Sequence, residues 1–128
     1  MTTTPVADRV VTGGVDTHAD VHVAAVVDHL GGVLGTASFP TTAAGYRDLM
    51  SWLRRYGPIG RIGVEGTGSY GAALARYLRS EQITVVEVSC ANRQVRRRHG
   101  KSDVVDAIAA ARAVLAGDAA ATPKSRDG

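Results

Sequence analysis

Residues 10–39 read VVTGGVDTHADVHVAAVVDHLGGVLGTASF. Within them, three Val-rich runs at 10–16, 21–28 and 33–39 are separated by the turns DTHAD and HLGG. Short runs of β-branched residues bounded by Gly and Asp are typical of strands, and the Gly-bearing HLGG is a hairpin signal. This stretch therefore predicts a three-strand antiparallel meander.

After the meander, helical and strand patterns alternate. Residues 42–56 place apolar side chains at helical spacing after the candidate N-caps Thr41 and Thr42, and a second helical pattern covers 69–80. RIGVEG at 61–66 and ITVVEV at 83–88 are strand patterns. Strands entered through helices pair in parallel, so we expect an α/β fold with a mixed five-stranded sheet flanked by helices.

The strongest helical pattern is the Ala-rich segment 103–117, which ends at a Gly C-cap. Its predicted buried stripe consists of Val104, Ile108, Ala111 and Leu115. We expect residues 1–9 to be a flexible N-terminus, 10–117 to be one domain, and 118–128 to be a linker or tail. The length of 128 residues fits this single domain.

Composition points to an intracellular protein. The single cysteine, Cys90, excludes an intramolecular disulfide, and no run approaches 18 consecutive apolar residues. The polar start MTTTPVADR lacks the apolar core of a signal peptide. We expect a cytoplasmic location and no membrane partner.

The net charge of +3 is unevenly distributed. Residues 91–101 contain no acid and hold five of the 15 basic side chains, namely Arg93, Arg96, Arg97, Arg98 and Lys101. The rest of the chain carries 10 basic and 12 acidic side chains. Charge runs are often only solvated surface, but guanidinium groups pair well with phosphate oxygens. With six aromatic residues in the chain, base stacking is disfavoured, so these five residues predict contact with a nucleic-acid backbone.

Four carboxylates form the candidate catalytic site. Asp16 ends the first predicted strand and Glu65 the fourth, while Asp103 and Asp106 are spaced i, i+3 in the first turn of the last helix. If the two strands are neighbours, the four carboxylates converge, and their mutual repulsion requires a cation. Such oxygen ligands suit one or two Mg²⁺ or Mn²⁺ ions, the arrangement used for in-line phosphoryl transfer.

Other chemistries fit less well. His18 and His22 suggest a zinc site, but no third nitrogen or sulfur ligand lies nearby in the sequence, and we expect His22 on a sheet face. Residues 66–69, GTGS, resemble a phosphate-binding turn but lack the Lys and the spacing of a P-loop. Any single acid could equally be an ordinary turn or helix-start residue.

Three segments resemble the DEDD transposases of bacterial insertion sequences, the "IS one-ten" class. They are GGVDTHADVHVAAVVD at 13–28, GVEGTGSYGAALARYL at 63–78 and NRQVRRRHGKSDVVDAIAAARAVLAG at 92–117, in the family's order and spacing. The resemblance covers nearly the whole chain. Its most specific part is the basic loop that runs into KSD-x-x-DA.

This resemblance implies an RNase H-like, RuvC-like fold in which Asp16, Glu65, Asp103 and Asp106 bind the metal ions. It also implies DNA partners, the ends and target of a mobile element, and a guide RNA encoded by that element. Family members carry a C-terminal domain with a nucleophilic serine and are expected to form homo-oligomers. We expect this chain to correspond to the N-terminal catalytic domain alone, without that C-terminal domain.

We therefore expect a metal-dependent transposase or recombinase domain that performs phosphoryl transfer on DNA. The alternative is a nucleic-acid-binding or assembly module without activity of its own, which would bind salt-sensitively and without Mg²⁺. An actin-like ATPase half shares the order of elements, but it needs a Gly-rich phosphate hairpin that does not follow Asp16.

Overall fold

A single mixed sheet forms the centre of the computed structural model, which describes residues 9–88, 102–117 and 121–123. The strands are β1 (Val11–Thr17), β2 (Val21–Val27), β3 (Val33–Pro40), β4 (Ile59–Glu65), β5 (Thr84–Val88) and β6 (Ala121–Pro123). Their order in the sheet is β3-β2-β1-β4-β5-β6. The predicted five-strand sheet, an antiparallel meander followed by two parallel strands, is confirmed.

Strand β6 is an addition that the sequence pattern does not predict. Residues 121–123 belong to the segment expected as a linker or tail, yet they pair antiparallel with β5 at the edge of the sheet. A run of three residues that includes Pro123 is too short to show a strand periodicity. The rest of that segment, 118–120 and 124–128, lies outside the described residues, as does the predicted N-terminus 1–9 except for residue 9.

Two helices cover one face of the sheet. They are α2 (Ala43–Arg54), which follows the meander, and α3 (Ala72–Ser80), which connects β4 to β5. Thr42 is the N-cap of α2, as predicted, and its hydroxyl accepts a hydrogen bond of 3.0 Å from the Gly45 backbone nitrogen. The main hydrophobic core lies between these helices and the sheet, built from Val, Leu and Ile side chains of both layers.

Helix α3 begins three residues later than the pattern predicted. The backbone nitrogens of Ser69 and Gly71 both donate to the Gly66 carbonyl oxygen, at 2.9 and 2.8 Å, and form a turn in place of the first helical turn. Gly66 has a φ of 74°, a conformation that side chains with a Cβ rarely adopt. The chain therefore turns sharply directly after β4, at the residue that follows Glu65.

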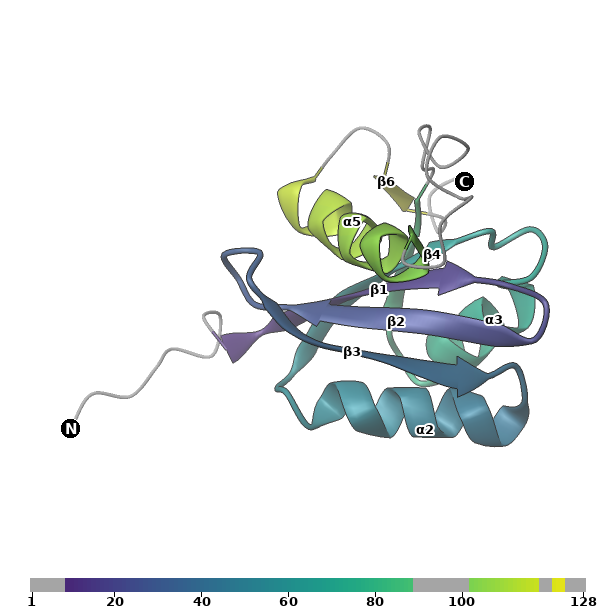
Figure 1. Ribbon diagram of the computed structural model, residues 1–128. Helices are drawn as coiled ribbons and strands as arrows, with labels where there is room; N and C mark the ends of the chain where they lie inside the picture. Colours follow the sequence, from purple (N-terminus) through teal and green to yellow (C-terminus); the bar gives the residue numbers. More distant parts are fainter. Residues whose placement is uncertain (1–8, 89–101, 118–120, 124–128) are drawn as a thin grey trace.

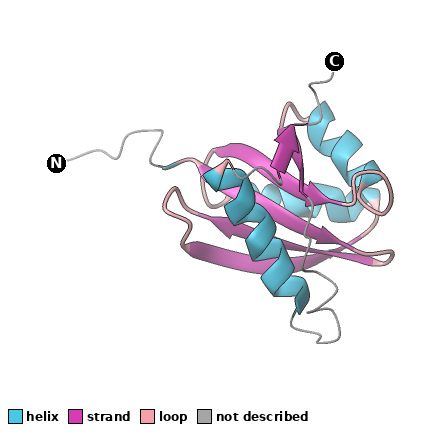
Figure 2. Ribbon diagram, turned by 90° about the horizontal axis from the view of Figure 1, so that it is seen from above, coloured by secondary structure: helices cyan, strands magenta, loops and turns pink. Residues whose placement is uncertain are grey.

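Helix α5 (Ser102–Ala116) covers the opposite face of the sheet from α2 and α3 (Figure 1). Figure 2 shows it lying across the strands on the side nearest the viewer. Gly117 follows it with a φ of 68°, as expected of a C-cap glycine. Two small clusters join α5 to the sheet, one to β5 and one to β2, and both use mostly Ala and Val side chains.

The buried stripe of α5 matches the predicted one at Ala111 and differs from it elsewhere. The structure buries Ala107, Ala110, Ala111 and Val114, whereas Val104 is 37% exposed. A Cβ added to Gly14 on β1 would collide with the backbone of Ala107 and Ala111. The helix packs against the sheet through its smallest residues because glycine on β1 lets the two backbones approach closely.

Over the described ranges, none of the helices combines the length and the apolar character needed to cross a lipid bilayer. Trp52 of α2 packs against two aromatic rings of the same chain. Its ring centroid lies 5.6 Å from that of Phe39 and 5.4 Å from that of Tyr56.

Candidate functional site

The parallel pairing of β1 with β4 places Asp16 beside Glu65. The register pairs Gly14 with Gly63 and Val15 with Val64, so Asp16 and Glu65 are the next residues on the two strands. Alternation along each strand puts both side chains on the same face as the two glycines, and Gly63 faces Ala110 and Val114 of α5. Both acids therefore project toward α5, and both are buried.

A hydrogen bond holds these two strand ends together. The Thr17 hydroxyl donates to the backbone carbonyl oxygen of Glu65 at 2.7 Å, and this contact is buried. The left-handed turn at Gly66 follows directly, and a Cβ there would lie 2.9 Å from the Thr17 hydroxyl oxygen. The end of β4 is thus fixed against the end of β1, which sets the backbone positions of the two acids.

Helix α5 contributes the other two acids from its first turns. Asp106 is 2% exposed and precedes Ala107, a buried residue in the contact with Gly14. Asp103 lies one turn earlier at the open end of the helix, where its side chain is 40% exposed. The spacing i, i+3 places both on the side of the helix that meets the sheet.

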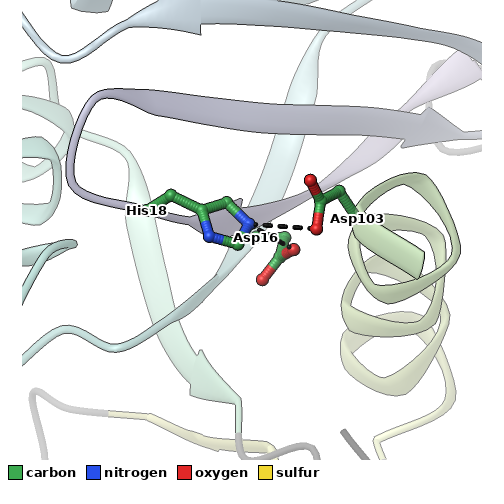
Figure 3. A group of neighbouring side chains, drawn as sticks. All are labelled: Asp16, His18 and Asp103. Carbon is green, nitrogen blue, oxygen red and sulfur yellow. Dashed lines mark hydrogen bonds and ion pairs between the residues drawn. The ribbon is translucent and has the colours of Figure 1, made fainter. Parts of the chain in front are cut away.

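A histidine lies between the strand and the helix. The Nε2 atom of His18 is 3.0 Å from Oδ2 of Asp16 and 3.2 Å from Oδ1 of Asp103 (Figure 3). The ligand atoms of these three residues all lie within 4.8 Å of one another. The Asp16 side chain is fully buried, whereas the His18 side chain is 33% exposed. The site is therefore closed at Asp16 and open to solvent at His18 and Asp103.

The donor atoms at this site fit a divalent cation. Carboxylate oxygens are the ligands that Mg²⁺ and Mn²⁺ prefer. Asp16 and Asp103 each place a carboxylate oxygen at this site, and Nε2 of His18 lies between the two. The buried carboxyl groups of Glu65 and Asp106 lie at the same end of the sheet and helix. A cation would offset the repulsion between the carboxylates of Asp16 and Asp103, which lie close together.

His22 belongs to a different part of the molecule. It lies on β2 and is fully buried, and its ring stacks on Tyr46 of α2 at 5.9 Å, so it faces away from α5. Burial is the main cause that lowers the pKa of His22 below its ordinary value of 6.5. The suggested zinc pair of His18 and His22 is therefore wrong, and the expected position of His22 on a sheet face is confirmed.

The predicted residues and the structure agree in part. Asp16 and Asp103 lie together, with Glu65 beside Asp16 in register and Asp106 buried one turn along α5. The five predicted nucleic-acid-binding residues, Arg93, Arg96, Arg97, Arg98 and Lys101, lie outside the described residues. His18 was missed as a site residue, because its partner Asp103 lies far from it in the sequence and only the fold brings the two together.

The comparisons with known proteins agree with this geometry. A family model for the DEDD transposases of the IS110 class, described as a transposase, matches residues 13–127. Among solved structures, the chain is similar to T. thermophilus RuvC in complex with a Holliday junction substrate, with a TM-score of 0.63 and 15% sequence identity. That alignment covers 89% of this chain and 99% of the RuvC chain. Curated proteins yield no match to this chain.

The likeness to RuvC confirms the predicted RuvC-like, RNase H-type fold. The family model extends from β1 through α5 and beyond, and so includes all four acids of the site. Since it spans most of the sequence, this chain belongs to the family of IS110-type DEDD transposases.

Proposed function

We propose that this chain is the catalytic domain of a DNA transposase and performs metal-dependent phosphoryl transfer at Asp16, Glu65, Asp103 and Asp106. The observation that carries the proposal is the meeting of Asp16 and Asp103, which lie far apart in the sequence, within 4.8 Å at one end of the sheet. Membership of the transposase family supports the reaction class, and the RuvC-like fold supports the position of the site.

The carboxylates of the site would hold one or two Mg²⁺ or Mn²⁺ ions. When bound there, such an ion would offset the negative charge of the scissile phosphate and would lower the pKa of an attacking hydroxyl or water. Asp16, buried at the closed end, anchors the site, while Asp103 at the open end is accessible to the substrate phosphate. The Thr17 hydrogen bond to the Glu65 backbone keeps the strand ends in register while a substrate binds.

The substrate in this proposal is DNA, contacted through its phosphates by Arg93, Arg96, Arg97, Arg98 and Lys101. Lys101 precedes Asp103 by only two residues in the sequence. A phosphate bound by Lys101 would therefore be near, in sequence, to the acid at the open end of the site. A guide RNA encoded by the mobile element is the second nucleic acid that we propose, on the basis of family membership. The same five basic residues suit either backbone.

A cleavage assay tests this function. Labelled duplex DNA and a four-way junction, the type of substrate bound in the RuvC structure, are incubated with the chain in Mg²⁺, Mn²⁺ or EDTA. We expect strand cleavage in either metal and none in EDTA, with loss of cleavage in Asp16→Asn and Asp106→Asn. Asp20→Asn is the matched control, because Asp20 is an exposed acid of the neighbouring turn.

Salt-sensitive DNA binding that needs no metal, with no cleavage in any condition, would contradict the proposal. That result would favour the alternative of a nucleic-acid-binding or assembly module.

A further inference from the structure

We propose that His18 supplies a nitrogen ligand to the ion held by Asp16 and Asp103, which makes the site select Mn²⁺ over Mg²⁺. The inference rests on the proposed function, because it concerns the same metal site. It goes further in naming a fifth residue, outside the four acids, and the ion preference that this residue confers.

The distances around Nε2 fit a shared metal ion. Ligand atoms at adjacent corners of an octahedron with bonds of ~2.1 Å are ~3 Å apart. Nε2 of His18 lies 3.0 Å from the Asp16 oxygen and 3.2 Å from the Asp103 oxygen, so it forms one such edge with each carboxylate. The 3.0 Å distance between Nε2 and the Asp16 oxygen is also that of a hydrogen bond, which forms when Nε2 carries a proton and no ion is bound.

The backbone around His18 holds the ring at this place. Its neighbour Thr17 is buried and bonded to the Glu65 carbonyl, and the His18 backbone nitrogen donates to the Val21 carbonyl oxygen at 3.1 Å across the turn. Asp16, two residues earlier, is buried. Because the turn is fixed on both sides, the ring can reach an ion between the two carboxylates without a rearrangement of the chain.

Figure 3 shows the imidazole edge that carries Nε2 directed at both carboxylates. Asp16 comes from β1 and Asp103 from α5, so the ring spans the gap between the sheet and the helix. The other described histidines cannot substitute for it: His22 stacks on Tyr46 on the far face, and His29 is exposed in the hairpin turn.

The nitrogen of His18 would change which metal ion the site prefers. Mg²⁺ prefers oxygen ligands and keeps its waters, whereas the transition-metal ion Mn²⁺ accepts an imidazole nitrogen more readily than Mg²⁺ does. A site of two carboxylates and one imidazole therefore favours Mn²⁺, while a site of carboxylates alone discriminates less. His18→Asn replaces the nitrogen with a carbonyl oxygen and should reduce the preference without removing the site.

Pulsed electron paramagnetic resonance of the Mn²⁺-loaded chain tests the ligand directly. We expect hyperfine coupling to a directly bound ¹⁴N nucleus in the wild type, its loss in His18→Asn, and its retention in His29→Asn. Titration calorimetry with each metal gives the second readout. His18→Asn should weaken Mn²⁺ binding by about tenfold or more and change Mg²⁺ binding much less.

The outcomes separate this inference from the proposed function. If Mn²⁺ binds and Asp16→Asn abolishes binding, but no ¹⁴N coupling is present or it survives in His18→Asn, the role of His18 is wrong and the metal site stands. If Mn²⁺ does not bind, or binds equally well to Asp16→Asn, the proposed metal site itself is wrong and the role of His18 fails with it.

Discussion

The Nε2 atom of His18 lies 3.2 Å from the Oδ1 atom of Asp103 and so connects the turn after β1 to the first turn of α5. This contact depends on how closely α5 approaches the sheet. If α5 lay farther from the sheet, Asp103 would move away from His18 and Asp16. The close packing of α5 against the sheet is therefore part of the site.

Gly14→Ala should destabilise the protein and weaken metal binding together. A Cβ at this position collides with backbone atoms of Ala107 and Ala111, which cannot move aside as a flexible side chain would. We expect a loss of ~1–3 kcal/mol in the free energy of unfolding, measured by urea denaturation, with a lower Mn²⁺ affinity in calorimetry.

Gly68→Ala is the control for this substitution, because a Cβ at Gly68 meets no atom within 4 Å. Equal losses of stability in the two variants would contradict the view that α5 needs the glycine on β1.

Saturating Mn²⁺ or Mg²⁺ should raise the melting temperature of the wild type. An ion that binds only the native state stabilises it by ~2.7 kcal/mol when present at 100 times its Kd. Asp16→Asn should abolish most of this rise, because Asp16 is the buried anchor of the site. Differential scanning fluorimetry with and without EDTA measures the effect. A full metal-induced rise in Asp16→Asn would mean that the ion binds elsewhere.

Acid should destabilise the protein through His22. Burial lowers the pKa of His22 in the folded state below the ordinary value of 6.5, so the unfolded state binds the proton more readily. The contribution of His22 to the free energy of unfolding is fully present above pH 6.5. It declines as the pH falls toward the lowered pKa, by at most ~1.4 kcal/mol per pH unit. His22→Phe keeps the stack on Tyr46 and removes the titrating group.

Unfolding measured from pH 8 to pH 5 should show a steeper acid loss in the wild type than in His22→Phe. Parallel curves for the two proteins would show that His22 does not cause the acid sensitivity.

Removing Arg96, Arg97 and Arg98 together should weaken DNA binding across all sequences alike. Each phosphate contact that is lost reduces the slope of log K against log salt by about 1, so the triple Ala variant should lose about 2–3 from this slope. Fluorescence anisotropy over a salt series provides the measurement. The triple Ala variant of Arg47, Arg55 and Arg76 changes the charge equally at exposed positions of the α2 and α3 layer. If both variants bind with the same slope, the basic segment is not the contact.

The sequence places Asp16 and Glu65 near the ends of two strands, so the two acids meet only if those strands are neighbours. The structure pairs β1 with β4 in parallel, which brings their carboxyl ends together. The pair Asp103 and Asp106 was equally visible, because their spacing places them on one side of a helix. These features depend on local sequence patterns and on the rule that neighbouring parallel strands end at the same edge of the sheet.

Two features depend on tertiary packing and could not be predicted. Helix α5 is rich in apolar residues on every side, so periodicity does not reveal its inner face, which Gly14 selects by admitting the backbone of Ala107. The place of His18 depends on the turn after β1 and on the position of α5, since its partner Asp103 comes from the other end of the fold. Spacing along the sequence contains neither piece of information.

Anomalous diffraction from crystals of the Mn²⁺-soaked protein locates the bound ion. We expect an anomalous peak beside the carboxylates of Asp16 and Asp103, at the end of the sheet where Glu65 and Asp106 are buried. The peak should be absent in Asp16→Asn crystals soaked in the same way. Peaks only at other acids, such as Asp28 in the hairpin turn, or an unchanged peak in Asp16→Asn, would contradict the assignment of this site.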